Sequence, residues 1–178
     1  MSRDAYTYHI EEASAGRRLV IALHGTGGSE QQMLPFTRAV APGAGILAPL
    51  GDTSEGPMRR FFVRRAEGDY DMEDLARATA KLGAFVRAQR DAIKPSRLIG
   101  LGYSNGANIL ASLMFAEPDL FDEAVLLHPL IPFEPEPAAV RARVLITAGE
   151  NDPICPPELT RSLEQWFTAQ GTPLESVW

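Results

Sequence analysis

Short runs of apolar residues alternate along this chain with longer segments in which apolar residues recur every three or four positions. Continuous apolar runs are typical of strands covered on both faces, and the longer period is typical of helices with one apolar face. The alternation predicts a single α/β domain, with a mostly parallel sheet and helices on both of its faces. The expected strands are Leu19–His24, Ile46–Pro49, Leu98–Gly102, Ala124–His128, Val144–Ala148 and Leu174–Trp178.

The helical pattern is found in four segments: Glu30–Val40, Asp71–Ile93, Asn105–Ala116 and Pro157–Gln170. The second is the clearest, because its apolar residues fall on one stripe and Asp69 or Asp71 can cap its start. Proline in the first turn and Gly171 just past the end favour the fourth helix. Pro35 argues against a regular helix through the whole of the first segment.

The stretch Leu50–Tyr70 is expected to be a long irregular loop, which in a compact domain is often a lid or a pocket wall. It contains the alternating run Met58–Arg65 (MRRFFVRR). Such a run can line a pocket, with Arg60 and Phe61 in contact with a substrate. More often the phenylalanines enter the core while the arginines pair with nearby acids, and this is the arrangement we expect.

Length and composition narrow the possible functions. The 178 residues, 45% of them hydrophobic, suffice for one well-packed domain. The net charge of −6 argues against a nucleic-acid partner, and no apolar run reaches membrane-spanning length. The polar start predicts no signal peptide, and the single cysteine, Cys155, fits a reducing cytoplasm. No residues have metal-ligand spacing, so no metal or other cofactor is expected.

The most informative motif ends the apolar run that begins at Leu98. The residues Gly102–Gly106 (GYSNG) fit the pattern G-x-S-x-G, and a helix of small residues is expected to follow directly. In this strand–turn–helix context the pattern indicates a nucleophile elbow, in which a strained turn exposes the serine hydroxyl and the glycines leave room for neighbouring backbone. Ser104 is therefore the expected nucleophile, at the carboxyl edge of the sheet.

A glycine-rich turn, Leu23–Gly28 (LHGTGG), follows the first expected strand. Its amides can point at a developing negative charge, as in an oxyanion hole. A phosphate-binding loop is the competing interpretation, but the run matches neither a P-loop nor G-x-G-x-x-G. We expect the amides of Thr26 and Asn105 to be the two donors. His24 is expected to brace the turn and is also a candidate substrate contact.

Asp152 follows the strand that begins at Val144, and it suits the acid of a Ser–Asp–His order. Glu150 is the alternative acid, and an ordinary loop role is the alternative for Asp152. Cys155 has no basic neighbour in the sequence, so a structural role is expected for it.

The chain has three histidines, His9, His24 and His128, and all of them precede Asp152. From the loop after its strand, His128 is not expected to reach Ser104 with support from Asp152, although it can lie at the pocket edge and contact a substrate. The base is expected beyond Trp178, in a histidine loop and closing helix that the 178 residues lack. If the protein ends there, we expect its activity to be lower by several orders of magnitude.

Together these residues resemble the phospholipase/carboxylesterase family of serine α/β-hydrolases, in the branch of bacterial hydrolases induced by hydroquinones and catechols. The matching segments are Leu23–Gly28, Ala48–Gly51, Glu55-Gly56, Arg60–Phe62, Arg64-Arg65, Glu67-Gly68, Gly102–Asn108, Leu127–Pro129 and Ala148–Pro153. The resemblance implies an α/β-hydrolase fold without a large cap domain, which acts on small carboxylic esters or thioesters, often as a homodimer. It also implies Ser104 as nucleophile, Asp152 as acid, and the amides of Thr26 and Asn105 in the oxyanion hole. The absent histidine departs from the family pattern.

The expected function is therefore hydrolysis of small carboxylic esters through an acyl-enzyme on Ser104. Two alternatives stay open. A chain without a base would be a catalytically impaired scaffold that binds a ligand or a partner. The same serine machinery would also support thioester or lactone hydrolysis.

Overall fold

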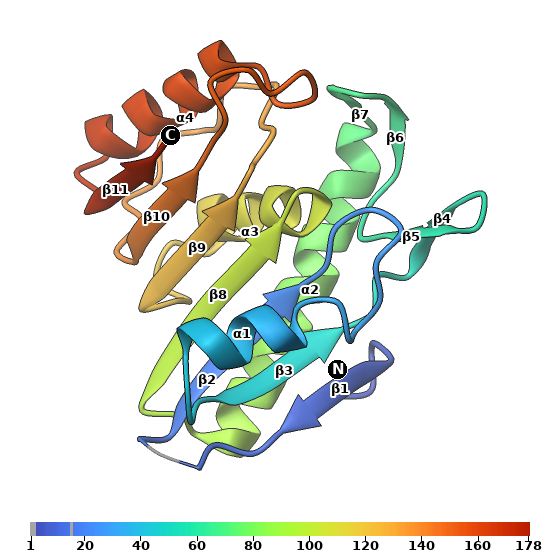
Figure 1. The fold of residues 1–178 in the computed structure, drawn as a ribbon, viewed down its shortest axis with the longest axis vertical. Coiled ribbons are helices and arrows are strands. Elements are labelled where there is room, and N and C mark those ends of the chain that lie inside the picture. The colour runs from blue at the N-terminus through green and yellow to red at the C-terminus, as the bar shows by residue number, and fades with distance from the viewer. Residues whose placement is uncertain (1–2, 15) are drawn as a thin grey trace.

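The computed structural model describes residues 3–14 and 16–178, so the first two residues of the polar start lie outside the description. Its centre is a seven-stranded sheet in the order β1-β3-β2-β8-β9-β10-β11 (Figure 1). Within this sheet β1 pairs antiparallel with β3, and the other pairings are parallel. The strands are β1 Tyr8–Glu11, β2 Arg18–Leu23, β3 Gly45–Pro49, β8 Arg97–Tyr103, β9 Glu123–Leu127, β10 Arg143–Thr147 and β11 Leu174–Val177.

The chain changes its direction of travel across the sheet between β2 and β8. From β2 it moves outward to β3, and it later returns to the other side of β2 with β8 and continues in sequence to β11. The loops that leave the carboxyl ends of β2 and β8 therefore diverge, and open α/β sheets bind their ligands in the crevice at such a point. The glycine-rich turn and the turn that carries Ser104 follow these two strands.

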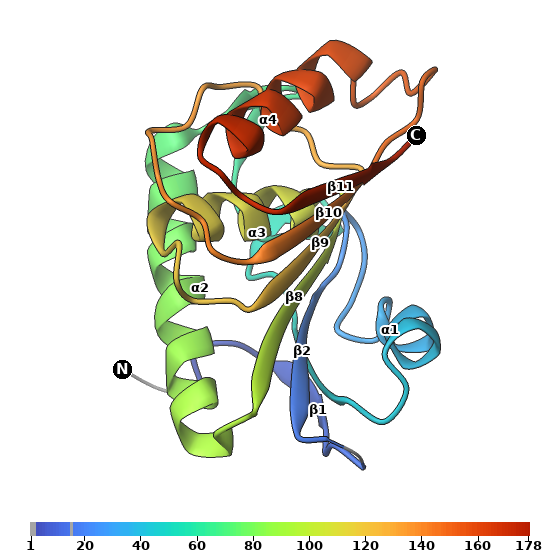
Figure 2. The same cartoon turned by 90° about the vertical axis from the view of Figure 1, so that its left-hand side faces the viewer.

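Helices lie on both faces of the sheet. Helix α1 (Leu34–Val40) lies on one face, and α2 (Met72–Ile93), α3 (Asn105–Ala116) and α4 (Pro157–Ala169) lie on the other (Figure 2). The second face holds the larger part of the core, where Leu82, Phe85 and Leu110 are fully buried. Burial of side chains of this size contributes about 1.5–3 kcal/mol each, so this packing holds α3, which starts beside Ser104, firmly on the sheet.

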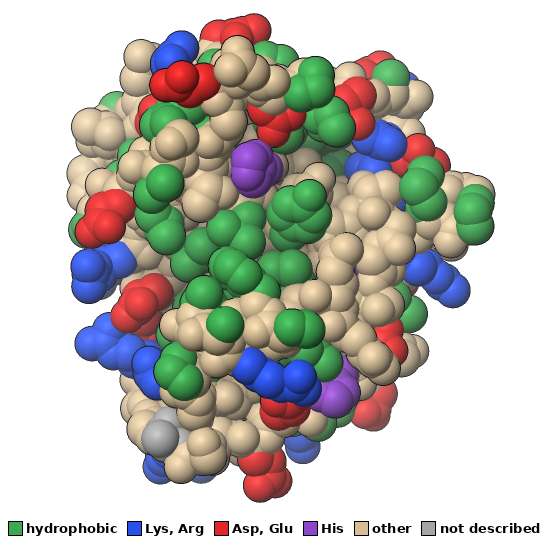
Figure 3. Space-filling model, in the orientation of Figure 1, with side chains coloured by type: hydrophobic (Ala, Val, Ile, Leu, Met, Phe, Trp, Pro, Cys, Tyr) green, Lys and Arg blue, Asp and Glu red, His purple; other side chains and the backbone are tan. Residues whose placement is uncertain are grey.

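The face that carries α1 is less fully covered by the described elements. Ile99, Val125 and Leu127 are only half-buried there, next to a smaller cluster that includes Val20 and Leu101. Apolar side chains gather on this face of the molecule, above α1 (Figure 3). Strands β8 and β9 therefore contribute apolar side chains to the surface on this side.

Most of the elements predicted from the sequence are present. Each expected strand, and each expected helix except the first, is observed with its ends shifted by at most one residue. Of the two candidate caps for α2, Asp71 is the one used, since its side chain accepts a hydrogen bond of 3.0 Å from the amide of Asp74. The expectation of a mostly parallel sheet with helices on both faces is confirmed.

Two expectations about the elements are wrong, and one strand of the central sheet was not predicted. The helix expected over Glu30–Val40 begins only at Leu34, because Pro35 fits the first turn of a helix, where its missing N–H is not needed. The stretch Leu50–Tyr70 is not irregular throughout. It forms two hairpins, β4 Thr53–Glu55 with β5 Met58–Arg60, and β6 Arg64–Ala66 with β7 Asp69–Tyr70. Strand β1 was not predicted, because its residues lie at a sheet edge and are only partly buried, so they lack an apolar pattern.

None of the helices in the described chain combines the length and the apolar character needed to cross a membrane.

Candidate active site

Ser104 lies at the sharp turn between β8 and α3. Its backbone has φ 50° and ψ −114°, a conformation that L-residues rarely adopt, at a cost of about 1–3 kcal/mol. The turn is held because the Ser104 amide donates to Leu127 O at 2.9 Å and Ser104 O accepts from the Asn108 amide at 2.9 Å. The side chain is half-buried, and its hydroxyl makes no hydrogen bond within the described residues. The strained turn thus presents an unengaged hydroxyl at the carboxyl end of β8.

The packing of this turn requires glycine on both sides of the serine. A Cβ on Gly106 would lie 2.6 Å from the carbonyl oxygen of His24, and closer still to that of Leu23. A Cβ on Gly102 would lie 2.6 Å from the amide nitrogen of Ala107. The serine turn therefore closes on itself only because position 102 lacks a side chain, and it touches the end of β2 only because position 106 lacks one.

We expect Gly106→Ala to lower the free energy of unfolding by about 3 kcal/mol or more, because backbone atoms at the end of β2 must move to admit the methyl group. The melting temperature, measured by circular dichroism, should fall by roughly 2–4 °C per kcal/mol. Gly171→Ala is the matched control, since a Cβ there meets nothing within 4 Å and only the φ of +74° is strained. That strain costs about 1 kcal/mol. Equal melting temperatures for the two variants would contradict the close packing described here.

Among the four amides of Gly25–Gly28, one has no acceptor within the described residues. The other amides of this turn have acceptors inside the protein: Gly25 on Gln32 Oε1 (2.8 Å), Gly27 on Arg59 O (2.9 Å) and Gly28 on Gly25 O (3.0 Å). The Thr26 amide, and that of Asn105 at the start of α3, have no acceptor among the residues that the structure describes. Because backbone donors are rarely left unpaired, these two N–H groups are available to an incoming oxygen atom.

His24 braces this turn from the interior. It is 1% exposed, its Nδ1 donates to Gly25 O at 2.7 Å, and its Nε2 accepts from the Gly51 amide at 2.9 Å. An amide can only donate, so Nε2 carries a lone pair and the ring is neutral, and burial likewise lowers the pKa of His24. With both ring nitrogens engaged below the surface, His24 does not make the substrate contact considered for it.

The run Met58–Arg65 divides between the interior and the surface. Phe61 and Phe62 are fully buried, and the ring of Phe61 packs against that of His24 with centroids 4.8 Å apart. Two of the arginines pair with acids: Arg64 with Glu55 and Glu67, and Arg65 with Asp69. The arrangement that we expected is therefore the one observed, and Phe61 lies below the surface that a substrate could reach.

Arg60 departs from this pattern because it is buried. Only 3% of its side chain is exposed, and Nη1 donates to Thr26 Oγ1 at 2.6 Å. Its nearest acid is Glu55, at 3.4 Å. The Arg60 guanidinium thus contacts the turn after β2 through Thr26, and it is buried at this point.

Asp152 and His128 form a pair at the ends of β10 and β9. Asp152 Oδ2 lies 3.1 Å from His128 Nδ1, and Oδ1 accepts from the amides of Ile154 at 2.8 Å and Cys155 at 3.0 Å. We expected that His128 would not reach Ser104 with support from Asp152, and the part of this expectation that concerns support from Asp152 is wrong. Asp152 and His128 come into contact because β9 pairs with β10. This pairing extends past the strand end, where the His128 amide donates to Thr147 O at 3.0 Å, so the loops that carry the two residues begin side by side.

The surroundings of Asp152 keep its carboxyl group ionised. Partial burial alone would raise its pKa, but the amides of Cys155 and Ile154 and the ring of His128 outweigh burial and hold the pKa below its usual value. The alternative acid, Glu150, is exposed. Cys155 Sγ donates to His128 O at 3.4 Å, and burial raises the pKa of this thiol to about 12, so it stays a thiol at neutral pH.

Ser104, His128 and Asp152 follow three adjacent strands. Tyr103 of β8 is paired with Leu127 of β9, and Leu127 with Thr147 of β10, so the three loops begin side by side. His9 lies instead on β1, at the far edge of the sheet, where its Nε2 is 3.0 Å from Glu11 Oε1.

A buried hydrogen-bond network behind Ser104 was not anticipated from the sequence. Asn108 Nδ2 donates to Tyr70 Oη at 2.9 Å and Asn108 Oδ1 accepts from the Leu130 amide at 2.7 Å, while Tyr70 Oη donates to Leu130 O at 2.7 Å. The network joins β7, α3 and the loop after His128. No local signal marks it, because its three members are far apart in the sequence.

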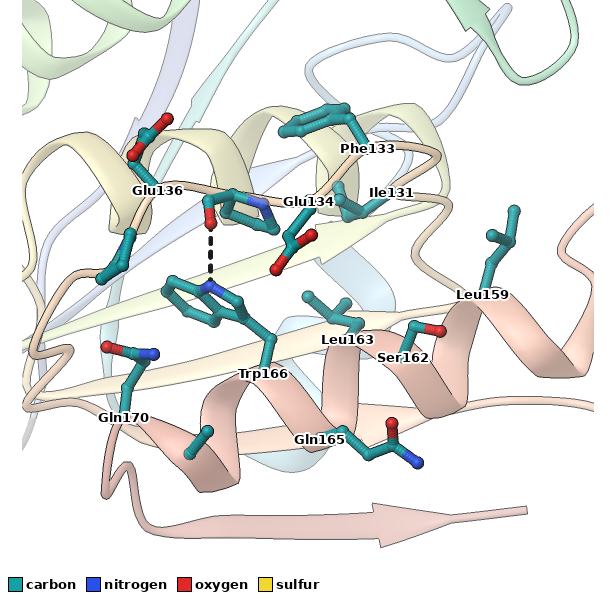
Figure 4. A pocket seen from close by; sticks show the side chains of 13 residues that line it. Ile131, Phe133, Glu134, Glu136, Leu159, Ser162, Leu163, Gln165, Trp166 and Gln170 are labelled. Carbon is teal, nitrogen blue, oxygen red and sulfur yellow. Dashed lines mark hydrogen bonds between the residues drawn. The ribbon is translucent and has the colours of Figure 1, made fainter.

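A cavity of about 790 Å³ lies apart from this site, between α4 and residues 131–137 (Figure 4). Its floor includes Leu163 and Trp166, and Trp166 Nε1 donates to Pro135 O at 3.0 Å. Its lining includes none of Thr26, Ser104 and Asp152. The cavity is therefore lined by residues other than these members of the candidate site.

Within the described part of the chain, no group of histidine, cysteine, aspartate and glutamate side chains is arranged to hold a metal ion.

Comparison with known proteins places the chain among hydrolases. No family model matches it. The Bacillus subtilis (strain 168) protein MhqD, whose name describes it as a hydrolase, is 36% identical over 176 residues, which cover 96% of this chain and 87% of that protein. Protein Atu2452 of Agrobacterium tumefaciens str. C58 is 51% identical with a TM-score of 0.93, covering 100% of this chain and 88% of that one. A Bacillus cereus carboxylesterase is 35% identical with a TM-score of 0.91, covering 97% and 84%.

These similarities extend over nearly the whole chain and include both turns of the candidate site. They agree with the resemblance carried by the motifs at Leu23–Gly28 and Gly102–Asn108. The mostly parallel sheet with helices on both faces is the α/β-hydrolase fold, which the solved structures share. The chain therefore belongs to the phospholipase/carboxylesterase family of α/β-hydrolases and is an enzyme of the hydrolase class.

Proposed function

We propose that this protein hydrolyses small carboxylic esters through an acyl-enzyme formed on Ser104. The observation that carries the proposal is an unengaged serine hydroxyl in a strained turn that packs directly on the end of β2, together with two amides from these two turns that lack acceptors, those of Thr26 and Asn105. The similarity to a carboxylesterase of known structure supports the ester as the bond that is cleaved.

In the proposed reaction Ser104 Oγ attacks the carbonyl carbon of the ester while its proton passes to an imidazole base. The carbonyl π electrons move to oxygen, and the amides of Thr26 and Asn105 donate to the oxyanion. Collapse of this intermediate expels the alcohol, which takes the proton from the base, and leaves the acyl group on Ser104. Water then attacks in the same way and releases the carboxylic acid.

Asp152 is proposed to orient the base. A carboxylate bonded to Nδ1 of an imidazole fixes the tautomer whose Nε2 can take a proton. In this structure the ring beside Asp152 is that of His128, whereas α/β-hydrolases usually draw the base from a histidine that follows the acid. A His128→Gln variant of the full-length protein distinguishes the two arrangements. If kcat falls by about 10²-fold or more, His128 is the base that takes the proton. If kcat falls by less, His128 only helps to hold Asp152 in place.

The proposal is tested with a panel of p-nitrophenyl esters from acetate to octanoate, together with a thioester and a lactone. We expect saturable hydrolysis of the short esters, with a rapid initial release of nitrophenol when deacylation is the slower step. If the thioester or the lactone is turned over faster than the carboxylic esters, that compound class is the better assignment of the substrate. Failure of the folded, full-length protein to cleave any member of the panel would contradict the proposal.

We further propose that the enzyme acts on small molecules in the cytoplasm, as a homodimer. The family resemblance supports the dimer, and a single, buried, free cysteine is in keeping with a reducing compartment. Size-exclusion chromatography with light scattering should give twice the mass of the chain. The mass of one chain at every protein concentration would contradict the dimer.

A further inference from the structure

The two amides proposed to bind the oxyanion come from separate parts of the chain. Thr26 lies in the turn after β2, and Asn105 is the first residue of α3. An oxyanion hole stabilises the transition state only while its donors stay at hydrogen-bond distance from one developing charge. A displacement of about 1 Å in such a site can cost a factor of about 10² in rate. Gly106 packs directly on the carbonyl groups of Leu23 and His24, which sets the distance between α3 and the end of β2. The Thr26 amide lies beyond this contact, so a further support is needed to hold it at a fixed distance from that of Asn105.

One segment, Arg59–Phe61, contacts both donor residues or their immediate neighbours. Each of its three residues makes one hydrogen bond either to the turn after β2 or to α3. They are Gly27 N–H to Arg59 O (2.9 Å), Arg60 Nη1 to Thr26 Oγ1 (2.6 Å) and Phe61 N–H to Asn105 Oδ1 (2.9 Å). Two of these bonds reach the turn after β2 and the third reaches α3, so the segment bridges the two halves of the site.

The segment is itself held firmly, which a bridge of this kind requires. Arg60 is paired with Thr53 in the β4–β5 hairpin, and Phe61 is fully buried against the ring of His24. A Cβ on Gly51, just after β3, would lie 3.1 Å from the amide nitrogen of Phe61. The backbone of the segment is therefore packed directly on the chain that leaves the sheet.

Arg60 also brings a positive charge next to the turn after β2. Only 3% of its side chain is exposed, and its nearest acid, Glu55, lies 3.4 Å away and is shared with Arg64 at 2.9 and 3.0 Å. The charge of Arg60 is therefore only partly neutralised. In a poorly solvated position, such a charge acts more strongly on a nearby developing anion than it would in water.

We propose that Arg60 is a positioning residue for the oxyanion hole, and that the segment Arg59–Phe61 keeps the Thr26 amide in register with that of Asn105. This inference rests on the proposed function of Ser104 and goes beyond it. Arg60 acts through Thr26 and does not touch the substrate.

The test compares Arg60→Met with Arg65→Met in the full-length protein. Both variants remove a guanidinium from the same run of sequence, but the side chain of Arg65 is 68% exposed and pairs only loosely with Asp69. We expect Arg60→Met to lower kcat for p-nitrophenyl acetate by about 10- to 100-fold with KM changed by less than about threefold, because the loss is confined to the transition state. Arg65→Met should keep the kcat of the unaltered protein.

Thr26→Val provides a second variant that does not depend on the stability of Arg60→Met. It removes the acceptor of the Arg60 hydrogen bond while keeping the shape of the side chain and the backbone amide. We expect Thr26→Val to lower kcat with little change in KM, as Arg60→Met does. Thr26→Ser keeps the hydroxyl and should therefore keep the kcat of the unaltered protein. The double variant Arg60→Met/Thr26→Val should lose much less than the product of the two single losses, because both changes remove one contact.

Binding of a trifluoromethyl ketone distinguishes the proposed positioning role of Arg60 from a purely structural one. This compound adds to the serine hydroxyl and places an alkoxide in the oxyanion hole, whereas the corresponding secondary alcohol cannot. Arg60→Met should weaken binding of the ketone by the same factor as kcat and leave binding of the alcohol unchanged.

Failure of this inference can be distinguished from failure of the proposed function. If the unaltered protein and Ser104→Ala hydrolyse esters equally, the proposed function fails. If hydrolysis depends on Ser104 but folded Arg60→Met and Thr26→Val both keep kcat within about twofold, only the positioning role of Arg60 is overturned.

Discussion

Replacing Ser104 with alanine in the full-length protein should lower kcat for p-nitrophenyl acetate by roughly 10⁴- to 10⁶-fold. The fold should survive, because the serine hydroxyl is half-buried and makes no hydrogen bond within the described residues. Its removal leaves no buried group unpaired, so the free energy of unfolding should change by less than about 0.5 kcal/mol. Steady-state kinetics and thermal unfolding of the same sample measure both effects.

Ser112→Ala is the matched control for this experiment. Ser112 lies on α3, the helix that follows Ser104, and its hydroxyl is hydrogen-bonded to Thr79 Oγ1 at 2.7 Å, away from the turn. We expect this variant to keep its kcat while losing about 1 kcal/mol of stability with the hydrogen bond. Wild-type kcat in a folded Ser104→Ala protein would be incompatible with an acyl-enzyme on this residue.

The second large effect is expected for Asp152→Asn, with a fall in kcat of about 10⁴-fold. The amide can still accept from the amides of Ile154 and Cys155, so the loop should keep its shape. It cannot stabilise an imidazolium, and its NH₂ group can hold the facing ring in the wrong tautomer. Measurement of kcat at neutral pH checks this prediction, with Glu150→Gln as the control because Glu150 is exposed. A greater loss in Glu150→Gln would assign the acid to that residue.

The same variant has a predictable effect on stability as the pH changes. The pKa of Asp152 is lowered in the folded protein, so the folded state favours the carboxylate. Its contribution to stability is present above the unfolded pKa of about 3.9, and it is lost as the pH falls through the lower folded value. The difference in unfolding free energy between the unaltered protein and Asp152→Asn should therefore be constant near neutrality and shrink in acid. Urea titrations at several pH values measure it, and a difference that grows in acid would contradict the lowered pKa.

The parts of the site that could be predicted from the sequence are those that a local pattern specifies. Glycines on both sides of Ser104 reflect contacts within one turn and with the strand beside it, and such glycines can be recognised without knowledge of the fold. The same holds for the turn at Thr26, where a glycine-rich run follows an apolar strand. Helix α2 was predictable because its cap, Asp71, and its apolar stripe all lie within one segment.

The parts that could not be predicted depend on contacts between distant residues. The contact of His128 with Asp152 follows from the pairing of β9 with β10, and sequence order alone pointed against it. The role of Arg60 depends on a hydrogen bond to Thr26, which is 34 residues away. The run Met58–Arg65 has arginines on both sides of its phenylalanines, and no local pattern distinguishes the buried Arg60 from the exposed Arg59 and Arg65.

The assignment of Ser104 is tested most sharply by reacting the full-length protein with a fluorophosphonate and locating the adduct by mass spectrometry of its peptides. If Ser104 is the nucleophile, one phosphonyl group per chain is expected, carried by the peptide that contains Ser104 and absent from Ser104→Ala. An adduct on another residue, or no adduct in protein shown to be folded, would contradict the assignment of Ser104 as the nucleophile.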